Sequence, residues 1–177
     1  MPLVLENFFP GDPGHTLHVH HTRDAYNRLT QKLVAAQAAL MRLQYDAAEQ
    51  ARFTLWFGPI IPATVAVVRH KVIAISLAVT HQNIIFRNGG SACTINTYAY
   101  VRPHTGLAKV YLCGVFFNSG RQGIDSAVGT IIHELSHLYA GTVDTTYTQA
   151  NCQALALNRS AAARNNADNY QYYCESF

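Results

Sequence analysis

The stretch HELSHLYAGTVDTTY, residues 133–147, contains two histidines, two carboxylates and a tyrosine around a single glycine. Upstream of it, Asp125 or Ser126 can cap a helix that runs through AVGTIIHELSHLYA. Gly141 suits the left-handed position at the C-terminal end of such a helix. The segment therefore predicts a helix that carries both histidines, followed by a sharp turn.

The spacing of these side chains predicts a catalytic metal site. Residues four apart lie on one face of a helix, so His133 and His137 can direct ring nitrogens at one ion. A catalytic zinc takes three protein ligands, and we expect Asp144 to return to the ion after the turn as the third. Glu134, about 100° around the helix from His133, is expected to act as general base on a water molecule. Tyr147 is expected to donate its hydroxyl to the oxyanion that forms when water attacks a carbonyl. These roles require one Zn²⁺ per chain.

Composition is typical of one globular domain. The chain has 177 residues, of which 49% are hydrophobic and 13% charged, and its formal net charge is +3. Such a composition excludes a disordered polar chain, and the scattered basic residues exclude a nucleic-acid partner. The longest apolar run, residues 64–79, is interrupted by an Arg-His-Lys triplet, so we expect no membrane insertion. The N-terminus lacks the features of a signal peptide, so we expect a removed leader or a non-classical export route.

Periodicity predicts an α+β fold in which the active-site helix lies below a small antiparallel sheet. Three short segments rich in β-branched and aromatic residues, NIIFRN, CTINTYAYV and KVYLCGVFF, predict a three-stranded antiparallel meander. Apolar residues at intervals of three and four predict helices elsewhere. The expected helices span residues 22–51, 62–81, 125–140, 148–163 and 167–175. We expect one domain over residues 22–177, preceded by an N-terminal arm at 1–21.

The arm contains HTLHVHH, residues 15–21, which raises the question of a second metal site. His18 and His20 would share one face of an extended strand. We interpret the segment as an N-terminal strand or arm without bound metal.

Four cysteines, an even number without CxxC spacing, favour disulfides over a thiolate zinc site. Cys93 and Cys113 fall on neighbouring expected strands, while Cys152 and Cys174 fall on expected helices. The simplest pairing is therefore Cys93 with Cys113 and Cys152 with Cys174. Buried free thiols are the alternative.

These motifs resemble the aspzincin family of zinc endopeptidases, whose signature is HExxH followed by GTxDxxYG. This chain has HELSH and then GTVDTTY. The resemblance covers about residues 22–177, because RFTLWFG, CTINTYAYV, VYLCGVFFN and NADNYQYY are also similar to segments of peptidyl-Lys members. It implies a zincin-like fold and a Cys93–Cys113 disulfide. It also implies the roles of ligand for His133, His137 and Asp144, of base for Glu134, and of oxyanion partner for Tyr147.

The chain departs from the family pattern at three places. The connection between His137 and Gly141 is short, so we expect the Asp144 loop to lie differently around the cleft. The glycine that closes the motif is Thr148 here. In NADNYQYY, lysine-directed members place acidic residues three apart, whereas this chain has Asp168 and Gln171. Gln171 supplies no charge, so we expect a weakened preference for lysine at P1′. The alternative for Asp168 is a carboxylate that is stabilised by the dipole of its own helix.

The resulting hypothesis is an exported, monomeric zinc metalloendopeptidase acting on proteins or peptides. One alternative is a secreted or injected bacterial toxin with a narrow target, which would use the same chemistry. Another is a catalytically silent zinc-binding module. A propeptide, inhibitor or immunity partner is left open.

Overall fold

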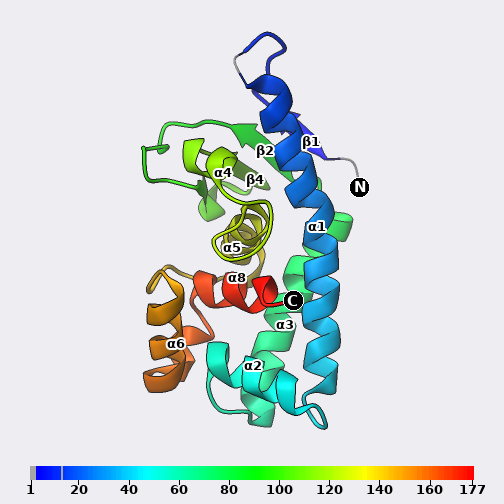
Figure 1. Cartoon of the computed structure of the whole chain (residues 1–177), viewed down its shortest axis with the longest axis vertical. Helices are drawn as coiled ribbons and strands as arrows, with labels where there is room; N and C mark the ends of the chain where they lie inside the picture. The colour runs from blue at the N-terminus through cyan, green and yellow to red at the C-terminus, as the bar shows by residue number, and fades with distance from the viewer. Residues whose placement is uncertain (1–2, 13) are drawn as a thin grey trace.

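The computed structural model describes residues 3–12 and 14–177, which form a mostly helical molecule with one small sheet (Figure 1). The strands are β1 (Val4–Glu6), β2 (Ile85–Asn88), β3 (Ala99–Val101) and β4 (Lys109–Leu112). The helices are α1 (His15–Arg42), α2 (Ala47–Phe57), α3 (Pro62–His81), α4 (Gly114–Asn118), α5 (Ala127–Ala140), α6 (Gln149–Asn158), α7 (Ser160–Ala163) and α8 (Ala167–Glu175), with a short 3₁₀ turn at Pro103–Thr105.

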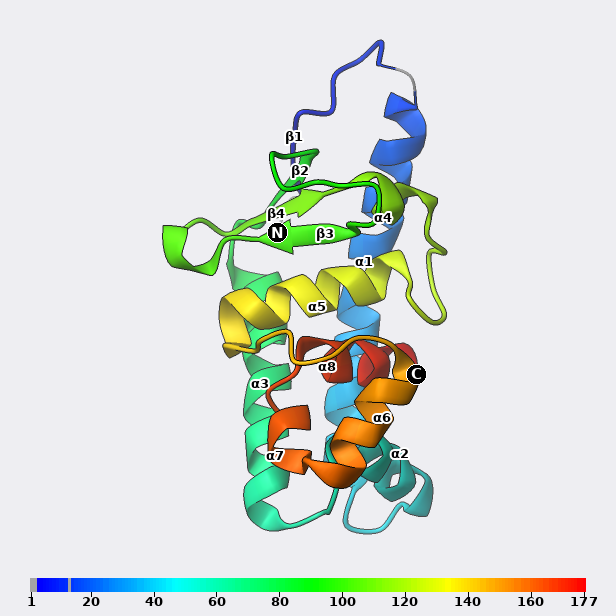
Figure 2. The same ribbon diagram turned by 90° about the vertical axis from the view of Figure 1, so that its left-hand side faces the viewer.

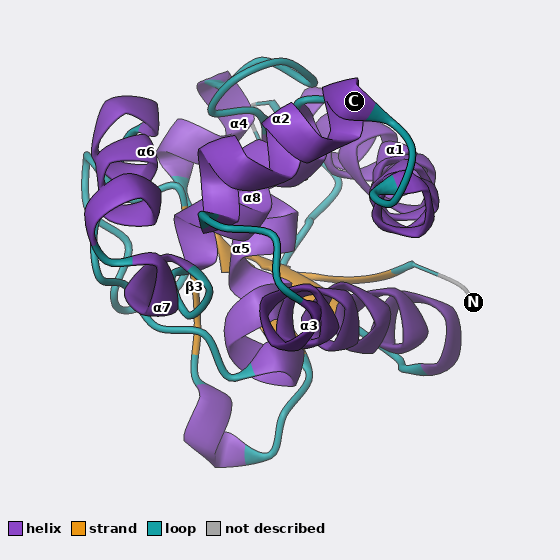
Figure 3. Ribbon diagram, turned by 90° about the horizontal axis from the view of Figure 1, so that it is seen from below, coloured by secondary structure: helices purple, strands orange, loops and turns teal. Residues whose placement is uncertain are grey.

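Helix α5 lies at the centre of the molecule. Figure 2 shows it crossing between the sheet on one side and α8 on the other. Helices α1 and α3 also pack against it, and Figure 3 shows α6 and α7 on the opposite side of α8 from α1. Because neighbours surround it, every residue from Ala127 to Ser136 is buried. The histidines of the HELSH segment therefore lie on a helix whose position is set by most of the fold.

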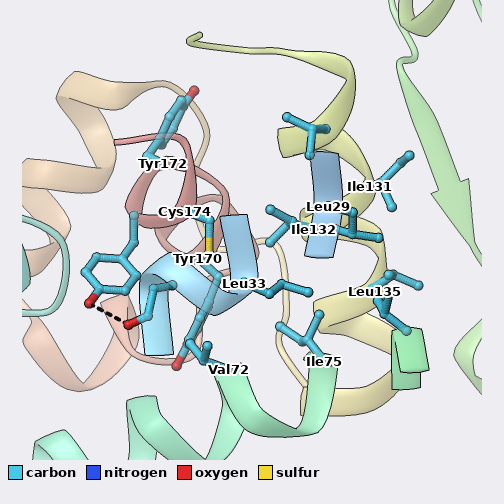
Figure 4. Packing of buried hydrophobic residues seen from close by; sticks show 14 of the residues in the cluster. Leu29, Leu33, Val72, Ile75, Ile131, Ile132, Leu135, Tyr170, Tyr172 and Cys174 are labelled. Atoms are coloured by element: carbon cyan, nitrogen blue, oxygen red, sulfur yellow. Dashed lines mark hydrogen bonds between the residues drawn. The ribbon is translucent and has the colours of Figure 1, made fainter. Parts of the chain in front are cut away.

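The hydrophobic core fills the space between α1, α3, α5 and α8. Figure 4 shows Leu29 and Leu33 of α1 facing Ile75 of α3 and Ile132 of α5, with Tyr170 of α8 closing one side. These side chains are at most 1% exposed. Burying each apolar side chain of this size contributes about 1.5–3 kcal/mol to folding, so the core fixes α5 firmly against its neighbours.

The long helix expected at residues 22–51 is wrong as a single element, whereas the helix at 62–81 is confirmed as α3. Helix α1 ends at Arg42, and α2 begins after Asp46. The Asp46 side chain accepts hydrogen bonds from the backbone N–H groups of Ala48 and Glu49, which makes it the N-cap of a new helix.

The strand or arm expected at HTLHVHH is also wrong, because these residues form the first turns of α1. His18 stacks on the ring of Phe117, with ring centroids 4.0 Å apart, and His21 packs edge-on against Phe116. The expected boundary at residue 22 therefore falls inside a continuous helix. Upstream of α1, the strand β1 pairs with β2, and we had not expected β1.

The sheet is mixed, so the expected antiparallel meander is wrong. Its order is β1-β2-β4-β3, with β1, β2 and β4 parallel and β3 antiparallel to β4. After β2 the chain skips one position to form β3 at the edge, and β4 then fills the gap. The strands are also shorter than expected, since the residues after Cys113 turn into α4.

By length and mean hydropathy alone, α3 could cross a membrane. A third of its most apolar window is buried inside the molecule. In the structure it packs against α1 and α5 through Val68, Val72 and Ile75. Lys71 donates hydrogen bonds to the backbone oxygen of Ala140 and to Oδ1 of Asn165. This lysine therefore ties α3 to the C-terminal end of α5.

One of the two expected disulfides is present. Cys93 and Cys113 are bonded and join the loop before β3 to the end of β4. The Cys152–Cys174 pairing is wrong, because both thiols are free and buried. The backbone oxygen of Cys152 accepts a hydrogen bond from Asn169 near the start of α8, and Cys174 lies five residues, or about 7.5 Å, further along that helix. Figure 4 shows Cys174 among the side chains of the core.

Candidate metal centre

Three predicted ligands meet at one point in the structure. Nε2 of His133 lies 3.0 Å from Nε2 of His137, and Oδ1 of Asp144 lies 3.1 Å from the first and 3.2 Å from the second. The two histidines come from successive turns of α5, and Asp144 comes from the loop that follows it. Tetrahedral ligands about 2.1 Å from a zinc ion are about 3.4 Å apart. The three atoms therefore have nearly the spacing that one ion requires.

The outer hydrogen bonds of the histidines leave the three atoms as acceptors when both rings are neutral, which is the form that binds a metal ion. Nδ1 of His137 lies 2.9 Å from the backbone oxygen of Thr142, which can only accept, so this nitrogen carries the proton. Nδ1 of His133 faces Oδ1 of Asp168 at 2.7 Å in the same way. In the neutral rings both Nε2 atoms therefore present lone pairs toward the Asp144 carboxylate. Three converging acceptors repel one another unless a cation lies among them, so the residues fit a metal ion.

The electrostatics of the site favour positive charge. Burial by itself lowers the pKa of His133, but hydrogen bonds to Asp144 and Asp168 outweigh it and raise the pKa to about 10. The pKa of His137 is also raised, mainly by Asp144 against the opposing effect of burial. Although burial alone would raise it, the pKa of Asp144 lies below its usual range because both histidines stabilise its charge. The site thus stabilises a cation at the point where the three ligand atoms converge.

Two local features fix the ends of α5 and so help to position its histidines. The Ser126 side chain caps the helix by accepting from the backbone N–H of Gly129 at 3.1 Å. At the other end, Gly141 adopts φ 59°, the left-handed conformation expected for it. The chain then reverses, and Figure 2 shows the following loop running past α8 toward α6.

A residue that sequence reasoning missed, Asn166, holds this loop in place. Its Oδ1 accepts from the backbone N–H groups of Thr145 and Thr146 at 2.8 and 3.1 Å. Next to it, Val143 pairs with Asn166 in an isolated parallel bridge. Asp144 therefore reaches the histidines because the segment before α8 holds its neighbours on both sides. Asn166 belongs to the NADNYQYY segment, but nothing local in the sequence signals this contact.

Thr148, at the position where the family signature ends in glycine, has a strained backbone conformation. Its backbone has φ 70° and ψ 149°, a region that is almost restricted to glycine. A β-branched residue there costs of order 1–3 kcal/mol. The turn after Tyr147 therefore keeps the conformation that suits glycine even though the residue has changed.

The ligands line a cavity of about 960 Å³ that also includes Glu134 and Tyr147. Glu134 is buried, which raises the pKa of its carboxyl group. The Tyr147 ring lies parallel to that of His133 with centroids 6.5 Å apart, and its side chain is half-exposed. Burial and the nearby Asp144 charge raise the pKa of Tyr147 to about 12, so its hydroxyl keeps its proton at neutral pH.

Asp168 and Gln171 both line this cavity but differ from our expectation in their contacts. Asp168 is hydrogen-bonded to His133 and so orients a predicted metal ligand, a contact that sequence reasoning did not foresee. Gln171 lies 3.4 Å from Oδ1 of Asp125, another cavity residue, which we had considered only as a helix cap.

Comparison with known proteins agrees with this geometry. A family model for the aspzincins, described as lysine-specific metallo-endopeptidase, matches residues 42–175. A peptidyl-Lys metalloendopeptidase of Pleurotus ostreatus is 36% identical over 156 residues, which are 83% of this chain and 86% of that protein. A peptidyl-Lys metalloendopeptidase of Armillaria mellea is 35% identical over 80% of this chain, and an extracellular protease of Aeromonas hydrophila is 37% identical over 76%. The chain spans 40% and 38% of the length of these last two relatives.

A solved structure is also similar. The zinc peptidase from Grifola frondosa aligns with a TM-score of 0.66 and 33% identity, covering 85% of this chain and 94% of that one. The family model spans most of the chain, and the relative from Pleurotus ostreatus is matched over most of its own length. The chain therefore belongs to the aspzincin family of metallo-endopeptidases.

Proposed function

We propose that the protein is a zinc-dependent endopeptidase whose ion is held by His133, His137 and Asp144. The observation that carries the proposal is the convergence of three acceptor atoms within 3.2 Å of one another, in a cavity that also contains a carboxylic acid and a phenol. When bound, zinc lowers the pKa of a water molecule and polarises the substrate carbonyl.

The chain's own side chains supply the proton transfers. Glu134 takes a proton from the attacking water and delivers it to the leaving amine, since it is the cavity carboxylic acid beside His133 on α5. The Tyr147 hydroxyl donates a hydrogen bond to the oxygen that becomes negatively charged. Asp168 holds the His133 ring in the orientation that binds metal. No covalent intermediate with the enzyme is needed.

The substrates are proteins or peptides, bound in the cavity beside α5. In this proposal the protein acts as a monomer outside the cell. Two observations favour the extracellular location: the Cys93–Cys113 disulfide and the name of the relative from Aeromonas hydrophila, an extracellular protease. Relatives named peptidyl-Lys metalloendopeptidases support lysine at P1′.

The test separates catalysis from metal binding. A denatured protein mixture is incubated with the zinc-loaded chain, with Glu134→Gln and with the matched control Glu6→Gln, which lies on β1 outside the cavity. New N-termini are mapped by mass spectrometry, and bound zinc is measured by elemental analysis. We expect all three proteins to bind one zinc, and the chain and Glu6→Gln to cleave while Glu134→Gln does not.

Two results would contradict the proposal. Absence of stoichiometric zinc in the unmodified chain would refute the metal centre. Zinc binding without cleavage would refute a general endopeptidase and favour the silent module or a toxin with a narrow target.

A further inference from the structure

The cavity contains a carboxylate that the proposed chemistry does not use. Among the described residues, four carboxylic side chains line it: Asp125, Glu134, Asp144 and Asp168. Asp144 bonds both histidines, Asp168 bonds His133, and Glu134 is the proposed base. Asp125 lies in the loop before α5 and contacts none of the metal ligands in the structure.

The backbone of Asp125 is held in a special conformation. Its φ is 53°, in the left-handed region, which aspartate tolerates better than most residues. The buried carboxylate of Glu175, at the end of α8, accepts from the backbone N–H of Asp125 at 3.2 Å and from that of Ser126 at 2.9 Å. Glu175 therefore holds the backbone of this loop where Asp125 lines the cavity.

Two cavity residues hold the Asp125 side chain in turn. The Tyr172 hydroxyl donates to Oδ1 of Asp125 at 2.7 Å, and Nε2 of Gln171 lies 3.4 Å from the same oxygen. Both contacts are with one oxygen, so Oδ2 stays available to a ligand. The residue itself is exposed to the cavity.

The neutral amide at position 171 is what permits this arrangement. A glutamate there would bring a second carboxylate to about the same distance from Asp125, and two carboxylates that close disfavour each other's ionisation. With glutamine, the amide donates to Asp125 instead. Beside Gln171 the cavity thus has the carboxylate of Asp125 in addition to that of Asp168, which is engaged with His133.

We propose that Asp125 supplies the negative charge that binds the basic side chain of a substrate's P1′ lysine, in place of the acidic residue missing at position 171. This inference rests on the proposed peptidase function. The lysine ammonium would lie between Oδ2 of Asp125 and the Gln171 amide, on the α8 side of the metal ligands. The weaker lysine preference that the neutral Gln171 would cause is then offset by the negative charge of Asp125, which lies in the loop before α5.

The experiment uses two peptides that differ only at P1′, with lysine in one and its uncharged isostere norleucine in the other. The ratio of kcat/KM for lysine over norleucine is measured for the zinc-loaded chain, for Asp125→Asn and for Asp125→Asn/Gln171→Glu. Asparagine also tolerates the left-handed conformation, so the loop keeps its shape. The matched control is Asp24→Asn, which removes a carboxylate paired with Arg121 outside the cavity.

We expect the unmodified chain and Asp24→Asn to prefer lysine. Asp125→Asn should reduce the ratio about 10–100-fold, the worth of one hydrogen bond to a charged group. Gln171→Glu should restore the ratio in the Asp125→Asn background, because the charge returns to the other position. Thermal unfolding and bound zinc confirm that each variant is folded and loaded.

Each outcome decides between the two proposals. If the unmodified chain cleaves and the ratio is the same in Asp125→Asn, or if it shows no preference for lysine, the assignment of Asp125 is wrong while the peptidase function stands. If the zinc-loaded chain cleaves neither peptide nor the protein mixture, both proposals fail.

Discussion

The contact between α5 and α8 makes a stringent prediction for Gly129→Ala. Glycine in a helix interior normally costs about 1 kcal/mol relative to alanine, and in the first turn of α5, where Gly129 lies, the substitution would gain at most about that much. Here a Cβ at position 129 would lie 1.7 Å from Oε1 and 2.5 Å from Cδ of Glu175, and 3.0 Å from Cγ of Gln171. The Glu175 carboxylate would have to withdraw from the start of α5.

The size of the expected loss in stability follows from the hydrogen bonds that the Glu175 carboxylate accepts. It accepts from the backbone N–H groups of Asp125 and Ser126 and from the Ser126 hydroxyl, the last at 2.7 Å. Above pH 7, where the Glu175 carboxyl group is ionised, each of these hydrogen bonds contributes about 1.5–3 kcal/mol, so losing two of them costs about 3–6 kcal/mol. Subtracting the gain in helix propensity of about 1 kcal/mol leaves a net loss of about 2–5 kcal/mol. The melting temperature should fall by roughly 5–20 °C.

The assay is thermal and urea unfolding of Gly129→Ala, Glu175→Ala and the double variant. Gly114→Ala is the control, because a Cβ at Gly114 meets nothing within 4 Å. We expect Gly129→Ala to be strongly destabilising alone but nearly neutral in the Glu175→Ala background, where its obstacle is gone. A Gly129→Ala protein as stable as the unmodified chain, or an equal loss in both backgrounds, would refute the reasoning.

Four further predictions concern single residues. Thr148→Gly should raise the free energy of unfolding by about 1–3 kcal/mol, measured by urea unfolding, whereas Thr148→Ala should not, because φ 70° suits glycine alone. Burial raises the pKa of Glu175 from 4.5 to about 7, so the folded state binds its proton more tightly. The stability that this group contributes should be fully present below about pH 4.5 and be lost as the pH rises through 7, and Glu175→Gln should remove this part of the pH dependence in unfolding experiments across the range. Asp168→Asn should weaken zinc binding about 10–100-fold in a competition titration with a chelator, since it loosens a ligand's orientation. The thiols of Cys152 and Cys174 should react with a thiol reagent only after denaturation, and reaction of the native protein, or no free thiol in the denatured one, would contradict their burial as free groups.

Much of the site could be predicted because its chemistry depends on local spacing. The i, i+4 relation of His133 and His137, the Ser126 cap and the left-handed Gly141 all act within one or two turns of helix, so periodicity and capping rules suffice for them. Asp144 follows so soon after the turn that its return to the histidines was also a reasonable expectation. The structure brings these three ligand atoms together as expected.

The sheet and the N-terminal region were predicted poorly for a physical reason. Strand segments can be recognised from β-branched and aromatic residues, but the pairing of β2 with β4 depends on where the chain passes between them. The HTLHVHH segment has few apolar residues, and it is helical because α1 packs its His18 and His21 on the rings of Phe117 and Phe116. Tertiary packing decided both cases.

Local spacing was therefore enough to predict the candidate metal ligands, the proposed base and the helix that carries them, since those depend on distances of a few residues. What surrounds them depends on tertiary packing. Hydrogen bonds join Asp168 to His133, Asn166 to the loop that carries Asp144, and Gln171 to Asp125. These partners are 20 to 46 positions apart in the sequence. Such contacts depend on how α8 packs across α5, and no local pattern encodes a packing angle between two helices.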